Sequence, residues 1–538
     1  MDKDKKKYLR SLLFRHLDGI SICGPISALN RSGITKYIQN HPIFTLKELL
    51  SQFKSNVGYL NVTLRLLTSQ GWLNQNIIKD GVNIHYKLTE KGQKCFQLSH
   101  YYDPFSDFIP NLINIEKYLF DSKSQSVKEE FRSLLDLLES FSTQYSKTYS
   151  PEWEIGRHLE GLLIGPILVT LGMSEYFLVN INIDQAIDKN TIGNNKSTLW
   201  LIIDFFLYLG WIEINDNEIR FTKEGIFFMR RASAYGVTVS YLPTFQKVPE
   251  LLFGNPNVLW QSKTDGQESH VNRRMNVWGS GGAHALYFSK IDEIIVEIFN
   301  QPIIDQPVGI ADMGCGDGTL LKHLYQVVKE KTIRGNNLDT YPLNVIGADF
   351  NKAARLASTI TLKEAGIPYS IINGDISNPD EYARILFDKH GLKLQEMLNV
   401  RSFLDHNRIY SPPKNNPDHK LCNSTGAFAF RGRWIPNKEL KQNLVEHFSA
   451  WTKYVSRYGL LMLELHTISP NLTYKHLGRT VATAYDGTHG FSDQYIIEVD
   501  IMLEAAKEAG LNPVAEYEVR FPNDEITTIS INLFRSNN

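Results

Sequence analysis

The stretch that decides the fold reads VGIADMGCGDGTLL and occupies residues 308–321. It is an apolar strand that ends in an acid, Asp312, followed by Gly314, Gly316 and Gly318 and then by a helix. Glycines at alternate positions let the backbone turn tightly and approach a ligand closely, and the N-terminus of the helix offers free amides. A dinucleotide-binding loop would instead read G-x-G-x-x-G. The spacing therefore predicts an α/β domain whose first loop binds a ligand of another kind.

Two further acids follow the next two predicted strands. The strand Leu343–Ala348 leads to Asp349, and the strand Tyr369–Asn373 leads to Asp375 and Ile376. Because the carboxyl ends of parallel strands meet at one edge of a sheet, these acids are expected to lie together. The first can accept both hydroxyls of a ribose, and the second can accept from an adenine amine. The sequence therefore predicts a nucleoside site across this edge.

The remaining apolar runs complete the sheet. They predict a fourth strand at Met397–Ser402 and a fifth at Leu460–Leu465. A helix at Ile501–Ala509 then precedes a closing hairpin made of Val514–Phe521 and Thr527–Phe534. The expected architecture is an α/β domain with a seven-stranded sheet.

The pattern Asp-x-Gly-x-Gly-x-Gly resembles the first motif of class I, Rossmann-like, S-adenosylmethionine-dependent methyltransferases. The resemblance implies a methyltransferase whose first loop holds the methionine part of S-adenosylmethionine (SAM). The predicted cofactor-binding residues, including one at the end of the fourth strand, are Asp312, Gly314, Gly316, Gly318, Asp349, Asp375, Ile376 and Arg401.

The first half of the chain holds an internal repeat. RHLDGI at residues 15–20 recurs as RHLEGL at residues 157–162, and each copy is followed by a Gly-Pro pair. Gly71-Trp72 and Gly210-Trp211 then each end a helical pattern before two short β-compatible runs. Helices followed by a small hairpin predict two α-rich, winged-helix-like repeats before the sheet domain.

A winged helix often binds DNA, but the charges here argue against it. The helix before the first wing, Gly58–Gln70, has one arginine, and the helix before the second, Thr198–Leu209, has none. Lys+Arg 57 against Asp+Glu 58 leaves a net charge of −1, so no global field attracts a phosphate backbone or anionic lipid. We expect no nucleic-acid partner, and we expect the repeats to dimerise the chain or to cover the substrate.

Length and composition set the remaining expectations. A chain of 538 residues corresponds to about three or four domains. Its four cysteines are scattered, its first residues lack the apolar core of a signal peptide, and no apolar run reaches the length of a membrane span. A cytoplasmic protein without a membrane partner is expected. The predicted domains are repeat one at 1–100, a helical connector at 101–150, repeat two at 151–245, a connector covering the cofactor at 246–290, and the catalytic domain at 291–538.

Longer strings resemble a narrower family. DMGCGDGTLLK at 312–322, VRSFLDHNR at 400–408, LFGN at 252–255 and GTHGFSDQY at 487–495 are similar to the starter-unit C-methyltransferases of polyketide synthase loading modules, such as those of the apratoxin and saxitoxin pathways. The resemblance covers nearly the whole chain. It implies methylation of the α-carbon of a malonyl or related acyl group, attached through phosphopantetheine to an acyl carrier protein. Family modules continue into further domains, so the chain is expected to be either a free-standing enzyme or an excised fragment.

The resemblance also implies a metal in some branches of the family. Those branches hold a mononuclear iron or manganese through the His and Gln of a His-Gly-x-Ser-Asp-Gln string, which are His489 and Gln494 here. Such a metal would chelate the malonyl group and stabilise its enolate. Saxitoxin-type relatives lack the histidine, so the metal is not universal.

Candidate catalytic residues follow the fourth strand. Asp405 and His406 lie where class I methyltransferases place substrate-handling groups, and an imidazole with a pKa of about 6.5 suits a general base at neutral pH. Alternatively, His406 and Arg408 orient the loop or bind the substrate carboxylate. Further substrate-binding candidates are His284 and Tyr287, near a glycine-rich run expected to close over the cofactor, together with Tyr495.

Three alternatives remain open from the residues alone. Basic residues between Pro412 and Arg433 could meet an acidic carrier protein, although a solvated loop is the default. The enzyme could instead be an O-methyltransferase for a carboxylate or hydroxyl of a small natural product. It could also be a regulator that binds the nucleoside without turnover. The basic residues in question are Lys414, Lys420, Arg431 and Arg433.

Overall fold

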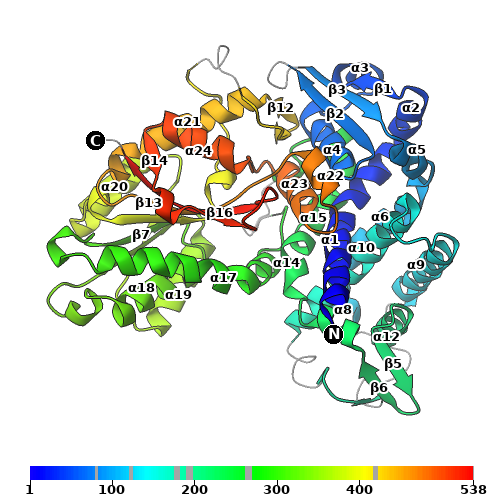
Figure 1. Cartoon of the computed structure of the whole chain (residues 1–538), viewed down its shortest axis with the longest axis horizontal. Coiled ribbons are helices and arrows are strands. Elements are labelled where there is room, and N and C mark those ends of the chain that lie inside the picture. The colour runs from blue at the N-terminus through cyan, green and yellow to red at the C-terminus, as the bar shows by residue number, and fades with distance from the viewer. Residues whose placement is uncertain are drawn as a thin grey trace. The chain divides into compact units, whose positions relative to one another are not determined.

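The computed structural model describes residues 1–78, 83–119, 125–174, 182–189, 198–260, 269–415 and 422–536 (Figure 1). The chain divides into two compact units. The helical unit comprises Met1–Ala283, Ala427–Trp434 and Ser469–Asp493, and the sheet unit comprises His284–Gly426, Ile435–Ile468 and Gln494–Asn538. Two segments of the C-terminal half therefore fold with the N-terminal half.

One mixed sheet forms the centre of the sheet unit. Its strands lie in the order β14-β16-β13-β10-β7-β8-β9, with β15 also beside β16. Five strands run parallel, and β16 runs antiparallel to β13. The order reverses around β7, so the glycine-rich loop leaves the sheet at a switch point, where α/β sheets bind ligands. The bounds are β7 Gly309–Met313, β8 Asn344–Asp349, β9 Ser370–Asn373, β10 Leu398–Ser402, β13 Leu460–Leu465, β14 Leu511–Pro513, β15 Val519–Phe521 and β16 Ile529–Ser536.

The closing edge of the sheet differs from the prediction. The expected strand Val514–Phe521 contains a 3-10 turn at Ala515–Tyr517, so only Val519–Phe521 of it forms a strand, β15, and another short strand, β14, precedes it. Ile531 of β16 pairs with Leu463 on one side and with Val519 on the other, so β15 lies on the edge of β16 that faces away from β13. The sheet therefore has eight strands, because its last position is split.

Helices cover both faces of this sheet. Figure 1 shows α18 and α19 on one side, and α20, α21 and α24 on the other. Helix α20 begins where the Asn378 side chain accepts from the Glu381 amide and ends at Gly391 in the left-handed conformation. A buried cluster that includes Met313, Tyr382 and Trp451 joins the sheet to the second layer. The bounds are α17 Arg273–Phe299, α18 Thr319–Lys331, α19 Lys352–Glu364, α20 Pro379–His390, α21 Asn437–Val455 and α24 Val499–Glu508.

Two winged-helix-like repeats build the helical unit, as predicted. Each has a three-stranded antiparallel sheet, in the order β1-β3-β2 and β4-β6-β5, and the helix α4 or α12 follows the first strand and precedes the hairpin. The strands are β1 Ile43–Thr45, β2 Leu73–Ile78, β3 Asn83–Leu88, β4 Ile187–Asp188, β5 Ile212–Asn215 and β6 Glu218–Phe221. The helices are α1 Lys3–Arg31, α2 Ile34–Asn40, α3 Leu46–Gln52, α4 Val57–Ser69, α5 Glu90–Gln97, α6 Tyr102–Asp107, α7 Ile109–Ile113, α8 Ile115–Leu119, α9 Gln125–Gln144, α10 Pro151–Met173, α12 Thr198–Tyr208, α13 Lys223–Met229, α14 Ser233–Ser240, α15 Leu242–Gln246, α16 Val248–Phe253, α22 Pro470–Lys475 and α23 Ala482–Gly490.

The repeated RHL-acid-G string forms the crossing point of α1 and α10. A Cβ atom on Gly19 would lie 2.3 Å from the Cα of His158, and one on Gly161 would lie 2.3 Å from the Cα of His16. Each histidine also bonds the hydroxyl of a tyrosine that follows the other repeat's wing: His16 Nδ1 lies 2.8 Å from Tyr235, and His158 Nδ1 lies 2.9 Å from Tyr102. The repeat is therefore a reciprocal helix contact, in which glycine permits the backbones to meet.

This crossing gives a stability prediction. Gly19→Ala places a methyl group against backbone, which cannot move aside as a flexible side chain can, so we expect the free energy of unfolding to fall by about 2–3 kcal/mol. Gly281→Ala is the matched control, because its Cβ would meet no atom within 4 Å. Urea unfolding measures both. A Gly19→Ala variant as stable as Gly281→Ala would contradict the crossing.

Helix α4, which a DNA-binding winged helix would present to a groove, is buried from Gly58 to Ser69 inside the helical unit. In the part of the chain that is described, α10 is long and apolar enough to cross a membrane by length and composition. However, 89% of its most apolar window is buried inside the protein, as in a core helix. Both helices therefore serve the packing of the helical unit.

Candidate active site

The glycine-rich loop connects β7 to α18. Gly314, Gly316 and Gly318 have φ angles of 78°, 54° and 81°, which side chains other than glycine rarely adopt. The amide of Gly314 donates to the carbonyl of Ala348 at 2.7 Å, and the amide of Gly316 donates to Asp349 Oδ2 at 3.3 Å. The loop is thereby bonded to the end of β8, and the two predicted binding segments form one edge.

Asp312 ends β7 as a buried carboxylate. The residue is 1% exposed, and its Oδ1 has no hydrogen-bond partner among the described residues. Burial raises its pKa well above the usual range, and the carboxylates of Asp349 and Asp317 add to the effect. A cationic amine would supply the missing partner, as the methionine amine of SAM does in the predicted site. The residues present therefore fit this cofactor.

The other two acids lie at the ends of the neighbouring strands. Asp349 Oδ1 accepts from the amide of Asn351 at 2.8 Å, and Asp375 Oδ1 accepts from both the amide and the hydroxyl of Ser377 at 2.8 Å. Ile376 is buried, and its carbonyl accepts from the indole of Trp451 at 2.8 Å. The structure thus brings Asp312, Asp349 and Asp375 to the ends of the adjacent strands β7, β8 and β9.

His406 lies in a 3-10 turn, Asp405–Asn407, just beyond β10. Its Nδ1 donates to Glu464 Oε1 at 2.6 Å, and its backbone amide donates to Glu464 Oε2 at 3.2 Å. Both side chains are buried. Because Nδ1 carries the proton, Nε2 carries the lone pair that a general base needs. Sequence reasoning missed Glu464, although an acid inside the apolar strand LLMLEL, residues 460–465, was the available signal.

Asp405 and Arg401 contact each other. Arg401 Nη1 donates to Asp405 Oδ1 at 2.6 Å, and His447 Nε2 donates to the same oxygen at 2.8 Å. Although burial opposes it, the guanidinium of Arg401 and the imidazole of His447 hold the pKa of Asp405 well below its usual range. Arg401 also stacks on Trp451, with its Cζ 3.9 Å from the ring centroid. These contacts hold both side chains in place beside the turn of His406, and the catalytic role of Asp405 and the cofactor-binding role of Arg401 stay predictions.

Three predicted substrate residues are buried in the sheet unit. Tyr287 of α17 packs against Phe403, with ring centroids 6.3 Å apart, and burial raises its pKa to about 12. The Cζ of Arg408 lies 5.7 Å from the ring centroid of Tyr495, and burial lowers the pKa of Arg408 to about 10. The Tyr495 amide donates to the carbonyl of His406 at 2.7 Å, so Arg408 and Tyr495 lie beside the turn that carries His406. The side chain of His284 lies outside the described residues.

The string that contains His489 is anchored in the helical unit. Tyr59 donates to Asp493 Oδ1 at 2.8 Å, and Arg65 Nε donates to Asp486 Oδ2 at 2.8 Å. Both donors come from α4, which explains why this helix is polar yet buried. His489 lies on α23, between Asp486 and Asp493 in the sequence, and its Nδ1 is 2.8 Å from the carbonyl oxygen of Tyr485.

The described residues do not add further protein ligands to the pair His489 and Gln494 that the resemblance implies for a metal. A hydrogen bond from His489 Nδ1 to a carbonyl would orient Nε2 as in many metal ligands. However, the described residues contain no group of three or more His, Cys, Asp or Glu that could hold a metal ion. Gln494 is buried and belongs to the sheet unit. A metal at His489 and Gln494 therefore stays a prediction, and no chemical step is assigned to it.

The predicted carrier-binding loop is partly folded. β11 (Phe428–Phe430) and β12 (Arg433–Ile435) form a hairpin, and Arg431 at its turn pairs with Asp493 at 3.3 Å and lies 3.8 Å from the ring centroid of Trp260. The guanidinium of Arg431 is therefore engaged by Asp493 and Trp260 of the same unit. Lys414 is exposed, and Lys420 lies outside the described residues.

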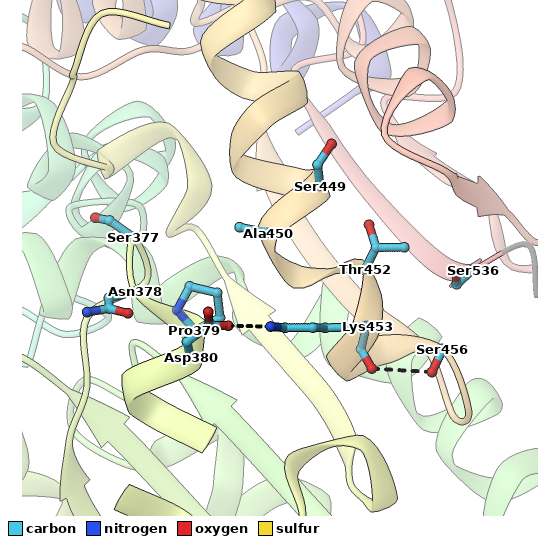
Figure 2. Close-up of a pocket in the computed structure, with 10 residues that line it drawn as sticks. All are labelled: Ser377, Asn378, Pro379, Asp380, Ser449, Ala450, Thr452, Lys453, Ser456 and Ser536. Atoms are coloured by element: carbon cyan, nitrogen blue, oxygen red, sulfur yellow. Dashed lines mark hydrogen bonds and ion pairs between the residues drawn. The ribbon is translucent and has the colours of Figure 1, made fainter. Parts of the chain in front are cut away.

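A pocket of about 530 Å³ lies at the start of α20 and the end of α21. Figure 2 shows its polar lining, with an ion pair of 2.8 Å between Asp380 and Lys453. None of the predicted cofactor or catalytic residues lines it. The pocket is therefore not the candidate active site.

Three families match the sequence. They are described as the AprA N-terminal domain, at residues 9–75, the AprA winged helix domain, at residues 160–255, and the AprA MT2-like domain, at residues 268–532. All three matches are to domains of AprA, and the third places a methyltransferase domain at residues 268–532. The chain is a SAM-dependent methyltransferase, and the predicted fold class, with its winged-helix region before the α/β domain, is confirmed.

Solved structures with a similar fold include three methyltransferases. An O-methyltransferase family protein from Burkholderia thailandensis is 11% identical, covering 75% of this chain and 99% of that chain at a TM-score of 0.39. The CurJ carbon methyltransferase is 11% identical, covering 77% and 98% at 0.31, and the mitomycin 7-O-methyltransferase MmcR is 10% identical, covering 70% and 97% at 0.37. No curated protein matches the chain. At these scores, the acceptors of the similar proteins are not carried over to this one.

Proposed function

We propose that this SAM-dependent methyltransferase methylates the α-carbon of a malonyl or related acyl group on an acyl carrier protein in polyketide biosynthesis. The observation that carries the proposal is the buried pair of His406 and Glu464, which supplies a base at the edge of the sheet that holds the cofactor residues. An α-carbon must lose a proton before it can attack a methyl group, so C-methylation needs such a base. The match to AprA domains supports a role in polyketide biosynthesis.

His406 and Glu464 act together in the proton transfer. His406 Nε2 takes the α-proton, and the electron pair of that C–H bond forms an enolate. SAM, when bound, supplies a methyl group on a sulfonium, which the enolate carbon attacks with release of S-adenosylhomocysteine (SAH). The carboxylate of Glu464 stabilises the imidazolium that His406 becomes, and water is excluded because both side chains are buried.

Arg408 is proposed to bind the carboxylate of the malonyl group. It is 4% exposed and remains cationic at neutral pH with its pKa of about 10. Its Nη1 donates to the carbonyl of Asp405 at 2.8 Å, so its guanidinium is held next to His406. A buried guanidinium suits a planar carboxylate, which it can bind through two parallel bonds.

Glu464→Gln tests the pair. The variant keeps the shape but removes the charge that stabilises the imidazolium, so we expect kcat to fall by about 10- to 100-fold. The dissociation constant for SAH, measured by titration calorimetry, is expected to remain within about twofold, because Glu464 lies on β13 and not on a cofactor loop. A matched loss of SAH affinity would contradict the assigned role.

An acceptor panel tests the substrate class. SAH release is measured with malonyl on a carrier protein, with malonyl coenzyme A and with small hydroxy and carboxy compounds, each with and without chelator. Turnover that requires the carrier supports the proposal, and turnover with a free hydroxyl or carboxyl compound would make the enzyme an O-methyltransferase. Loss of turnover with chelator would restore iron or manganese at His489 and Gln494 to the mechanism.

A further inference from the structure

Three side chains form a stripe along α21. Asn443, His447 and Trp451 are four residues apart, so they share one face of the helix. Asn443 is 8% exposed, Trp451 is fully buried, and the side chain of His447 is 6% exposed. Buried polar groups cost free energy unless they are bonded, and leucine would pack α21 as well. The partners of these three groups therefore indicate what the stripe does.

Trp451 holds the loop that follows β9. Its indole Nε1 donates to the carbonyl of Ile376 at 2.8 Å. Ile376 and its neighbour Asp375 are predicted to face the adenine of SAM. The ring of Trp451 also lies 3.9 Å from the Cζ of Arg401, which extends from β10. One end of the stripe is thus bonded to the cofactor loop.

His447 and Asn443 hold the loop that carries His406. His447 donates to Asp405, the residue before His406, at 2.8 Å. Asn443 accepts from Arg408 Nε at 2.9 Å and donates to the carbonyl of Ser411 at 2.8 Å. The other end of the stripe is therefore bonded to the chain on both sides of His406.

We propose that the stripe of Asn443, His447 and Trp451 fixes the cofactor loop and the base-carrying loop relative to each other. This inference rests on the proposed function, in which His406 is the base. Arg401 links the two ends, because it pairs with Asp405 and stacks on Trp451. Methyl transfer requires the base, the acceptor carbon and the methyl group to be aligned, and a displacement of about 1 Å can cost about 100-fold in rate. The three side chains are positioning residues and touch none of the reacting atoms.

Substitutions along the stripe are expected to separate binding from turnover. Trp451→Phe keeps an aromatic ring but loses the N–H that holds Ile376, so SAH affinity is expected to fall about 5- to 10-fold. His447→Leu is expected to keep SAH affinity within about twofold and to lower kcat about 10- to 100-fold, and Asn443→Leu is expected to do the same. His447→Gln retains a donor for Asp405 and is expected to recover most of the lost kcat.

Titration calorimetry with SAH and kcat on malonyl-loaded carrier protein supply the two readouts. Ser449→Ala is the control on the same helix, since its exposed hydroxyl bonds only the carbonyl of Val445, and both readouts are expected to remain unchanged. Unchanged SAH affinity in Trp451→Phe would overturn the inference. It would also be overturned if His447→Leu and His447→Gln lost SAH affinity and kcat to the same extent as each other. An enzyme that binds SAH but methylates no acceptor would overturn the proposed function instead, while the Trp451→Phe titration would still test the stripe.

Discussion

Replacing His406 by alanine is expected to lower kcat about 1000-fold, the largest effect of any single substitution considered. The imidazole is held by the buried carboxylate of Glu464, in the turn that follows β10. His406→Ala is expected to keep SAH affinity within about twofold, because the side chain bonds Glu464 and not a cofactor loop. Single-turnover methylation and calorimetry with SAH measure the two quantities.

His323→Ala is the matched control for that experiment. His323 lies on α18 and bonds Asp292 at 2.6 Å near the surface, away from Glu464 and the turn at 405–407. We expect its kcat to match that of the unsubstituted enzyme. If His406→Ala retained more than about a tenth of the rate, the imidazole would be an orienting group, which the sequence alone left equally open.

Asp312→Asn is expected to give the largest loss of SAH affinity. The substitution removes the charge that would pair with the methionine amine, so SAH affinity is expected to fall about 10- to 100-fold. Asp317→Asn, in the same loop, is the control, since Asp317 Oδ1 accepts from the amide of Thr319 at 3.0 Å. Calorimetry that shows equal affinities for the two variants would contradict the assignment of Asp312 to the amine.

Asp312→Asn is expected to stabilise the enzyme when no ligand is bound, although it weakens the binding of SAH. Because the folded state raises the pKa of Asp312, its contribution to stability is present below the pKa of the unfolded chain and is lost as pH rises through the folded pKa. Above the pKa of the unfolded chain, the burial of Asp312 therefore costs stability. Asp312→Asn is expected to raise the free energy of unfolding by about 1–3 kcal/mol without ligand. Urea unfolding at pH 5 and pH 8 checks that this gain grows with pH.

The catalytic fold could be predicted because its signals are local. Strand β7 and the glycines that follow it are adjacent in sequence, and the three positive φ angles are what that spacing requires. The acids Asp349 and Asp375 were also placed correctly at strand ends, since each strand was readable as an apolar run. The split of the last edge position into β14 and β15 was not readable, because Val514–Phe521 is apolar enough for a continuous strand.

The contacts that organise the site could not be predicted, because they join residues distant in sequence. Glu464 lies 58 residues from His406, and His447 lies 42 residues from Asp405. The sequence pattern indicated both Asp405 and His406 as catalytic candidates, with the imidazole as the general base or as an orienting group. The structure distinguishes them, since Asp405 is held by Arg401 and His447 while His406 is held by Glu464.

The repeat in the helical unit could be predicted from the sequence, but the contact between its two copies could not. Gly19 and Gly161 occupied matching positions in two similar strings, which indicated a duplicated unit but not a contact between the copies. The structure shows that each glycine receives the backbone of the other copy's histidine. Similarly, α4 has few charges because it is a buried helix. Its polar residues Arg65 and Tyr59 bind Asp486 and Asp493 in the interior of the helical unit.

Intact-protein mass spectrometry of a malonyl-loaded carrier protein tests the central claim most directly. The carrier is incubated with SAM and either the unsubstituted enzyme or His406→Ala, and the acyl group is then released by alkaline hydrolysis, which cleaves the thioester and any methyl ester. We predict a gain of methyl mass on the intact carrier that depends on His406, and a released acid that keeps the methyl group, as a methyl group on carbon must. A methyl group lost with ester cleavage, or no gain on the carrier by an enzyme that binds SAH, would contradict C-methylation of a carrier-bound acyl group.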